Sequence, residues 1–187
     1  MINNPNKHSK QMIKTTTIET PLGEMTAAAT KEGVCLLAFT GKHSLNTEFD
    51  DLAWLFNTTV KAGTNRHLRA LKKQLKEYFK GKRKEFSISV VTPGTEFQQT
   101  VWNSLMKIPY GTTISYLRQA KLINNPGAVR AVANADGANR IVIIIPCHRV
   151  IGSDGDLTGY GGGIEKKKWL IDHEKKFSGQ PVDVSLF

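Results

Sequence analysis

A cysteine and a histidine stand side by side at the end of the most apolar run of the chain. Residues 141–145 are all aliphatic and lead into Pro146, Cys147 and His148. Such a run predicts a buried strand, and a proline ends its ladder, so we expect Cys147 at a strand end. A thiolate is a nucleophile, and a nearby imidazole or a cation such as Arg149 can lower the thiol pKa. On these residues alone, an inert buried cysteine remains the favoured interpretation.

The residues that follow supply a loop and a helix. The glycine-rich segment 155–163 is typical either of a loop that closes over a ligand, with free backbone N–H groups, or of an ordinary surface loop. Residues 165–174 have helical spacing, which places Trp169, Leu170 and His173 on the inner side. Glu174 falls in the last turn of that helix.

The segment before the apolar run predicts three helices. Thr95 and Gln98 form a capping box that starts the first, which ends at residues 109–111. Ser115 caps a short helix over 115–122, and a third helix is expected over 126–135, with Pro126 in its first turn. Two short helices joined by a tight turn indicate a helix-turn-helix. The small residues of the third helix suit close approach to another helix or to a DNA groove, and Arg130 keeps the DNA interpretation open.

The first half of the chain predicts short strands and two helices. We expect strands at 15–20, 34–39 and 86–90, a short helix over 48–57, and an amphipathic helix over 66–80 that ends at Gly81. Residues 92–94 break the pattern, which predicts an N-terminal domain over 1–92, with a disordered tail over 1–12, and a C-terminal domain over 93–187. The expected fold class is α+β.

Charge and cysteine content limit the kinds of binding partner and metal site that the protein can have. The chain has 187 residues and a formal net charge of +10, which favours a polyanion such as nucleic acid or simply a basic solvated surface. The densest basic run, 66–84, is interpreted mainly as a solvated helix face. Two cysteines exclude a disulfide framework and a four-cysteine zinc site, and they fit a reducing cytoplasm. No run approaches the roughly 18 apolar residues of a membrane span, and no secretory signal is expected.

The order of these motifs resembles a known family. IPCHRV, preceded by NP-x-A-V-R-A-V and followed by G-x-L-T-G-Y-x-G-G and W-L-x-x-H-E, is similar to the O6-alkylguanine-DNA alkyltransferases, the methylated-DNA–protein-cysteine methyltransferase family. The resemblance is strong over 95–174 and covers 1–92 only in layout. It implies a small N-terminal domain with an antiparallel sheet and helix, and a helical C-terminal domain with a winged-helix-like helix-turn-helix.

The resemblance implies an irreversible transfer. Cys147 would accept a methyl or alkyl group from O6-alkylguanine in duplex DNA, with O4-alkylthymine as a further candidate substrate, after the nucleotide is flipped out. His148 would take the thiol proton through water, Glu174 would orient His148, and Asn139 would brace the active-site turn. The protein is consumed in a single turnover, because no second nucleophile removes the alkyl group.

The resemblance also implies contacts to the base and the duplex. The carbonyls of Cys147 and Val150 would accept from the guanine amino group, while Tyr160 and the Gly161 amide would receive the O6 side. The helix-turn-helix would enter the minor groove, and the residues expected to contact DNA there are Arg130, Tyr116, Gly127, Ala128 and Ala131. Arg130 would fill the gap left by the base, and Tyr116 would crowd the 3′ phosphate.

No metal or cofactor is expected. Some relatives bind zinc in the N-terminal domain through two cysteines and two histidines, but this domain has only Cys35 with His8, His43 and His67. Cys35 is expected in the core, and the protein is expected to be a cytoplasmic monomer. Three alternatives remain: a lesion binder that does not react, a helix-turn-helix regulator in which Cys147 only packs, and a thiol hydrolase.

Overall fold

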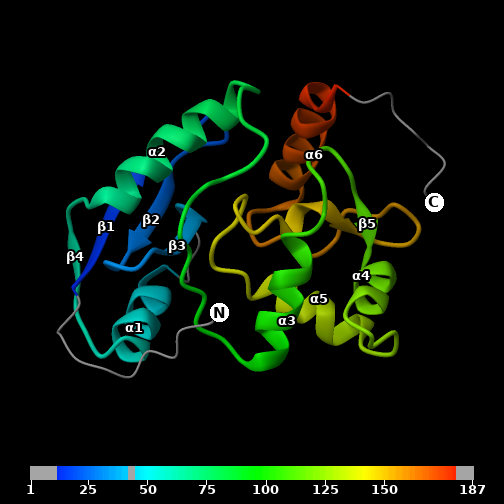
Figure 1. Cartoon of the computed structure of the whole chain (residues 1–187), viewed down its shortest axis with the longest axis horizontal. Coiled ribbons are helices and arrows are strands. Elements are labelled where there is room, and N and C mark those ends of the chain that lie inside the picture. The colour runs from blue at the N-terminus through cyan, green and yellow to red at the C-terminus, as the bar shows by residue number, and fades with distance from the viewer. Residues whose placement is uncertain (1–11, 42–44, 180–187) are drawn as a thin grey trace. The chain divides into compact units, whose positions relative to one another are not determined.

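The computed structural model describes residues 12–41 and 45–179, which form two compact units. The first unit runs to Lys73 and includes Ile88–Pro93, and the second comprises Gln74–Ser87 and the chain from Gly94 onward (Figure 1). Segment 74–87 therefore groups with the later residues, and a single boundary near residue 92 stays a prediction. The predicted tail, up to residue 11, and both His8 and His43 lie outside the described residues.

A four-stranded sheet forms the first unit. Its strands are β1 (Ile13–Ile18), β2 (Met25–Ala29), β3 (Val34–Phe39) and β4 (Val60–Ala62), in the order β3-β2-β1-β4. The pairs β1–β2 and β2–β3 are antiparallel, as expected, but β4 pairs parallel with β1, so the sheet is mixed. Strand 34–39 is confirmed, while the expected strand at 15–20 begins and ends two residues earlier.

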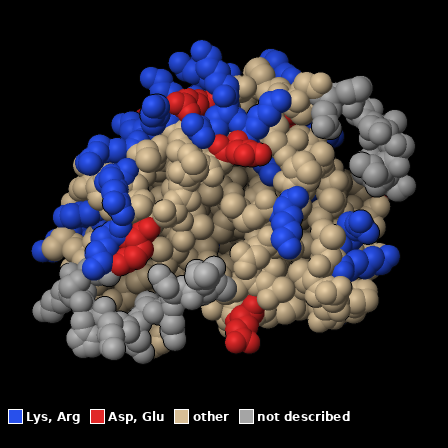
Figure 2. All heavy atoms as spheres, in the orientation of Figure 1, with Lys and Arg blue, Asp and Glu red and all other residues tan. Residues whose placement is uncertain are grey.

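Two helices accompany the sheet. They are α1 (Leu45–Leu55) and α2 (Arg66–Phe79). Leu52 of α1 packs in a buried cluster with Ile13, Leu36 and Cys35, which confirms Cys35 as a core residue. The amphipathic reading of α2 is also confirmed, since its leucines are buried while its cations are exposed. Figure 2 shows Lys and Arg side chains gathered over this helix.

The predicted strand at 86–90 is wrong. Only Val90 makes a bridge, to Val34, and no ladder extends from it. The reason lies in Gln74, whose Oε1 atom accepts from the Ser87 amide at 2.9 Å and whose amide nitrogen donates to the Ser87 hydroxyl at 3.0 Å. A side chain therefore satisfies the backbone group that a strand neighbour would have used.

Helices dominate the second unit. They are α3 (Glu96–Leu105), α4 (Tyr116–Leu122), α5 (Val129–Gly137) and α6 (Ile164–Ser178), with a small parallel sheet of β5 (Ile114–Ser115) and β6 (Val150–Ile151). The capping box of Thr95 and Gln98 and the Ser115 cap are both confirmed. Helix α5 begins three residues later than expected, because Pro126 and Gly127 form a turn closed by the Ala128 amide donating to Asn125 O.

The aliphatic run at 141–145 is a buried turn and not a strand. Ile143 has a φ of +74°, and the Ile145 amide donates to Ile141 O at 3.0 Å, so the chain folds back on itself. All five residues are buried, which explains why they are all apolar. Cys147 accordingly opens the short 3-10 helix η1 (Cys147–Arg149). Among the described residues, no helix is both long and apolar enough to cross a membrane.

Candidate active site

Asn139 holds the turn that presents Cys147. Its side-chain amide donates to Ile145 O at 2.8 Å and to Cys147 Sγ at 3.2 Å, and its Oδ1 atom accepts from the Ile141 amide at 2.9 Å. One side chain thus spans both ends of the turn and reaches the thiol. The left-handed backbone at Ile143 is the strained element that these bonds stabilise.

The thiol of Cys147 is buried and protonated. Burial raises its pKa to about 11, against the Asn139 hydrogen bond and the charge of Lys167, which both lower it. The lowering that His148 or Arg149 could have produced is not realised, because the net shift of the thiol pKa is upward. Arg149 does not serve the thiol, because its guanidinium donates to Ile108 O and to Glu174. A proton acceptor is needed before this sulfur can act as a nucleophile.

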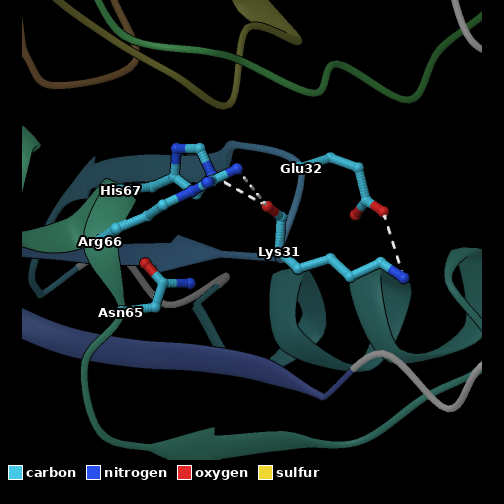
Figure 3. A pocket seen from close by; sticks show the side chains of 5 residues that line it. All are labelled: Lys31, Glu32, Asn65, Arg66 and His67. Carbon is cyan, nitrogen blue, oxygen red and sulfur yellow. Dashed lines mark hydrogen bonds and ion pairs between the residues drawn. The ribbon is translucent and has the colours of Figure 1, made fainter.

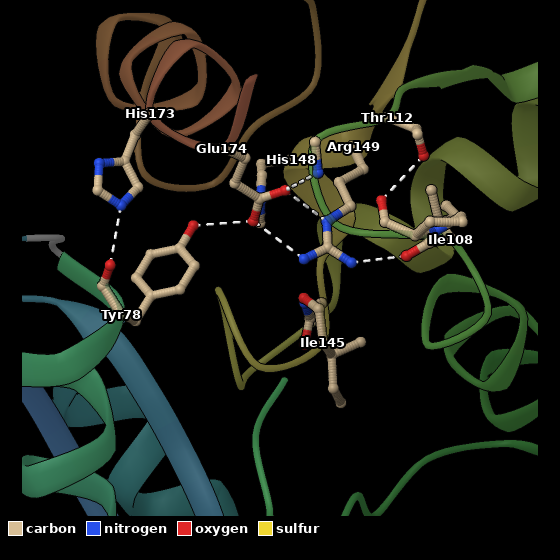
Figure 4. Close-up of polar contacts among 11 residues, drawn as sticks. Tyr78, Ile108, Thr112, Ile145, His148, Arg149, His173 and Glu174 are labelled. Atoms are coloured by element: carbon tan, nitrogen blue, oxygen red, sulfur yellow. Dashed lines mark hydrogen bonds and ion pairs between the residues drawn. The ribbon is translucent and has the colours of Figure 1, made fainter. Parts of the chain in front are cut away.

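Glu174 is the polar centre of the second unit. Oε1 accepts from the Tyr78 hydroxyl at 2.9 Å, from His148 Nε2 at 2.9 Å and from Arg149 Nη2 at 3.0 Å. Oε2 accepts from Arg149 Nε at 2.8 Å and from the Gly111 amide at 3.0 Å. Figure 4 shows Tyr78, His148 and Arg149 converging on this carboxylate. Burial opposes its charge, but His148 and Arg149 outweigh burial and hold the pKa of Glu174 well below its usual range.

These bonds fix the tautomer of His148. Burial lowers the pKa of His148, although Glu174 acts in the opposite direction, so the ring is neutral near pH 7. An ionised carboxylate can only accept, so Nε2 carries the hydrogen and donates to Glu174. Nδ1 is then a bare acceptor, and it is buried with no hydrogen-bond partner among the described residues. The arrangement is a neutral imidazole that can accept a proton at Nδ1 and whose orientation is fixed by a carboxylate.

Sequence reasoning missed two members of this cluster. Tyr78 lies at an inward position of α2, where its aromatic ring cannot be told from ordinary core, yet its hydroxyl binds Glu174 and its carbonyl accepts from His173 Nε2 at 2.9 Å. Arg149 was noted only as a cation near Cys147. No local pattern distinguishes either role, since both partners come from α6, at least 25 residues away.

The segment 158–161 lies against Tyr116. The carbonyl of Thr158 accepts from the Tyr116 hydroxyl at 3.2 Å and from Lys167 Nζ at 2.7 Å. Burial raises the pKa of Tyr116 to about 12, so its hydroxyl keeps its proton at neutral pH. Tyr160 is buried, and its hydroxyl has no partner among the described residues. Gly161 follows it and is half-buried.

Four of the five predicted DNA-contact residues lie on α5 or the turn before it, while the fifth, Tyr116, is buried on α4. Gly127, Arg130 and Ala131 are exposed, and Ala128 is half-buried at the start of the helix. The opposite side is buried, and it is fixed by Trp102 Nε1, which donates to Ala135 O at 2.8 Å. The small residues therefore leave an exposed helix surface with one long cation.

Val150 lies directly after the 3-10 helix. It is fully buried in β6, and its amide donates to the Cys147 carbonyl. One lone pair of that carbonyl remains for another donor.

The first unit has a separate hollow of about 530 Å³, where α2 begins. Asn65 caps α2 by accepting from the Leu68 amide at 3.0 Å, and His67 Nε2 lies 2.9 Å from Lys31 O (Figure 3). The His67 bond connects the turn after β2 to the start of α2. We therefore interpret the hollow as a structural contact between these two elements. Within 12–41 and 45–179, no group of three His, Cys, Asp or Glu side chains is placed to hold a metal ion.

Comparisons with known proteins agree along both parts of the chain. Residues 13–92 match the ribonuclease-like domain of 6-O-methylguanine DNA methyltransferase, and residues 96–176 match its DNA binding domain. The methylated-DNA–protein-cysteine methyltransferase of Mycolicibacterium paratuberculosis is 40% identical over 176 residues, which cover 94% of this chain and 99% of that protein. The enzyme of the same name from Methanosarcina acetivorans is 42% identical over 156 residues, covering 83% and 94%.

Solved structures give the same result. The crystal structure of Mycobacterium tuberculosis O6-methylguanine methyltransferase has a TM-score of 0.77 at 40% identity and covers 94% of this chain and 99% of its own. The structure of Mycobacterium tuberculosis OGT in complex with DNA has a TM-score of 0.75 at 40% identity, with coverage of 89% and 94%. This chain therefore belongs to the methylated-DNA–protein-cysteine methyltransferase family.

Proposed function

We propose that this protein repairs DNA by moving the alkyl group of O6-alkylguanine onto Cys147. The observation that carries the proposal is a neutral His148, next to Cys147 in sequence, whose Nε2 hydrogen is held by ionised Glu174 and whose Nδ1 is left bare. Family membership adds the class of reaction, and the exposed face of α5 adds a surface of suitable shape for duplex DNA.

The transfer is a single displacement. The Sγ–C bond forms as the C–O6 bond breaks, and the electron pair of the broken bond stays on the purine. The thiol proton passes through a water molecule to Nδ1 of His148, and the purine takes up one proton to become guanine. Nδ1 suits this role because it is the one bare nitrogen of the ring. The product is S-alkylcysteine, so each molecule reacts once.

The substrate must leave the base stack to reach a buried thiol. Flipping costs a few kcal/mol, and it costs least where pairing is already weakened, as at an alkylated guanine. In this proposal Arg130 fills the vacated position from the exposed face of α5, and Gly127, Ala128 and Ala131 allow the helix to approach the minor groove. The Tyr116 hydroxyl, which keeps its proton at neutral pH, crowds the 3′ phosphate.

The flipped base is held by the loop and the 3-10 helix. The carbonyls of Cys147 and Val150 accept from the guanine amino group. The Tyr160 hydroxyl, buried and without a partner among the described residues, and the Gly161 amide face the O6 side. O4-alkylthymine presents an alkyl group on a similar exocyclic oxygen and is a second candidate substrate. We also propose that the protein acts as a monomer.

A labelled duplex tests the proposal. Protein in stoichiometric amount is mixed with DNA that carries labelled O6-methylguanine, and the label is mapped by peptide mass. We expect one methyl group per protein on Cys147, none with Cys147→Ser, and full transfer with the control Cys35→Ala, which removes the other thiol. Binding of methylated DNA without transfer by the wild type would instead indicate a lesion binder, and repeated turnover would contradict a consumed protein.

A further inference from the structure

A buried carboxyl that the proposed reaction does not use lies under α5. Asp136 is 2% exposed, and its Oδ1 atom accepts from Gln119 Nε2 at 3.1 Å. The same Gln119 nitrogen lies 3.2 Å from Ser104 Oγ, and the Ser104 hydroxyl donates to Val101 O. A single polar network therefore joins α3 to α4 and α5, the two short helices of the predicted helix-turn-helix.

Two oxygens of this network lack donors. Asp136 Oδ2 and Gln119 Oε1 are both buried, and neither has a hydrogen-bond partner among the described residues. They belong to two groups that already touch through their other polar atoms. An ionised carboxylate cannot donate to the amide oxygen of Gln119. A protonated Asp136 can, because the hydroxyl at Oδ2 is a donor and Gln119 Oε1 is an acceptor. One proton thus offers a partner to two orphaned atoms, each of which is costly to bury unpaired.

The surroundings favour that proton. Within 12–41 and 45–179, Asp136 interacts electrostatically with three titratable groups: Lys167 of α6, Tyr116 of α4 and Cys147 of the 3-10 helix. From α3 the network receives only neutral groups such as Ser104. Burial raises the pKa of Asp136 from 3.8 to about 7, although the Gln119 bond and Lys167 act to lower it. When Asp136 does ionise, its charge raises the pKa of the Cys147 thiol.

We propose that Asp136 is a positioning residue that carries a proton, donates from Oδ2 to Gln119 Oε1, and so keeps a negative charge away from the Cys147 thiol. Loss of the proton weakens the attachment of α5 to α3 and α4, and it also opposes formation of the Cys147 thiolate. The role in repair rests on the proposed function, but the effect on the thiol does not.

Alkylation by iodoacetamide, mapped to Cys147 by peptide mass, tests this effect without DNA. The sulfur bonds to the CH₂ carbon, iodide leaves and the thiol proton goes to solvent. We compare wild type with Asp136→Asn, whose side-chain amide can still donate to Gln119 but never ionises. The two rates should agree near pH 5.5, and the variant should be severalfold faster near pH 8.5. The control Asp172→Asn, an exposed carboxyl on α6, should follow the wild type throughout.

A rate ratio that stays constant with pH would overturn the proposal, because a merely structural role gives no pH dependence. Carbon NMR of wild-type protein with labelled aspartate carboxyls gives a measurement that needs no variant. One aspartate should titrate near pH 7, and titration of every aspartate below about pH 5 would overturn the proposal as well. If the thiol behaves as expected but labelled duplex yields no S-methylcysteine, the proposed function fails and this inference stands.

Discussion

The charge of Glu174 should carry much of the stability of the second unit. Glu174→Gln keeps the size of the side chain but removes its charge, and it turns one acceptor oxygen into a donor. Arg149, which is 8% exposed, then keeps its own charge without an ionised partner. Breaking a buried ion pair in this way costs about 3–5 kcal/mol. At ~2–4 °C per kcal/mol for a chain of this size, the melting temperature should fall by roughly 6–20 °C.

The control for this substitution lies on the same helix. Glu165 is exposed in the first turn of α6, so Glu165→Gln loses only a helix-dipole interaction, worth under about 1 kcal/mol. Thermal and urea unfolding of both variants at pH 7 give the comparison. A loss below about 1 kcal/mol for Glu174→Gln would refute the reasoning, because it would mean that Arg149 finds another partner or water.

The pH dependence has a definite sign. The pKa of Glu174 is lower in the folded protein than its ordinary value of 4.5, so its stabilisation is fully present above that value and is lost as the pH falls toward the folded pKa. The difference in free energy of unfolding between wild type and Glu174→Gln should therefore be constant from pH 6 to 8 and should shrink below about pH 4.5. A gap that grows in acid would contradict the assignment of Glu174 as the ionised partner.

The same substitution should slow methyl transfer. Without the carboxylate, the Nε2 hydrogen of His148 has only a neutral amide oxygen to accept it, and the ring loses the charge that supports its protonation. Because a positioned general base is worth about 10²–10⁴ in rate, the loss of its charged partner should lower the rate by up to that amount. Single-turnover transfer from labelled DNA, measured well below the melting temperature of the variant, separates this effect from unfolding. A rate equal to that of wild type would show that His148 needs no such orientation.

Three further outcomes follow from single contacts. The folded-state pKa of Asp136 is raised from 3.8 to about 7, so the free energy of unfolding of the wild type should fall by about 4 kcal/mol relative to that of Asp136→Asn as the pH rises from 4 to 7. Urea unfolding at pH 5 and 8 should therefore show a larger advantage in stability for Asp136→Asn at pH 8. Gly159→Ala should destabilise more than the control Gly155→Ala in thermal melts, since both have positive φ but only at 159 would a Cβ lie 2.8 Å from the Tyr116 hydroxyl. Tyr78→Phe removes one donor from a buried carboxylate and should cost about 1.5–3 kcal/mol in urea unfolding.

Local signals in the sequence predicted the helices well. The capping box at Thr95 and the Ser115 cap involve atoms within three residues of each other, so their chemistry is readable without the fold. The stripe of leucines in α2 is equally local. Strand β4 was missed because it has three residues, and its pairing partner β1 lies more than 40 residues away.

The turn at 141–145 shows where such reasoning stops. An aliphatic run predicts that a segment is buried, but a central strand and a turn enclosed by helices are both buried, so the run does not distinguish them. What decides between them is the Asn139 side chain, which supplies the hydrogen bonds a sheet would otherwise provide. In the same way, the residues around Glu174 come from α2, the 109–111 turn, the 3-10 helix and α6, and no spacing in the sequence brings them together.

The electrostatics of the site suit a thiol that can be used only once. Because burial raises the pKa of Cys147 to about 11, the thiol is almost entirely protonated at pH 7, far more completely than an ordinary cysteine. Small electrophiles in solution meet the sulfur in its unreactive form. In the proposed reaction a base delivered into the site is different, because its reacting carbon would be held beside the sulfur while the neutral His148 takes the proton. Such placement is worth an effective concentration far above that of any free reagent. Burial thus costs intrinsic reactivity but preserves the thiol for the substrate that the protein itself positions.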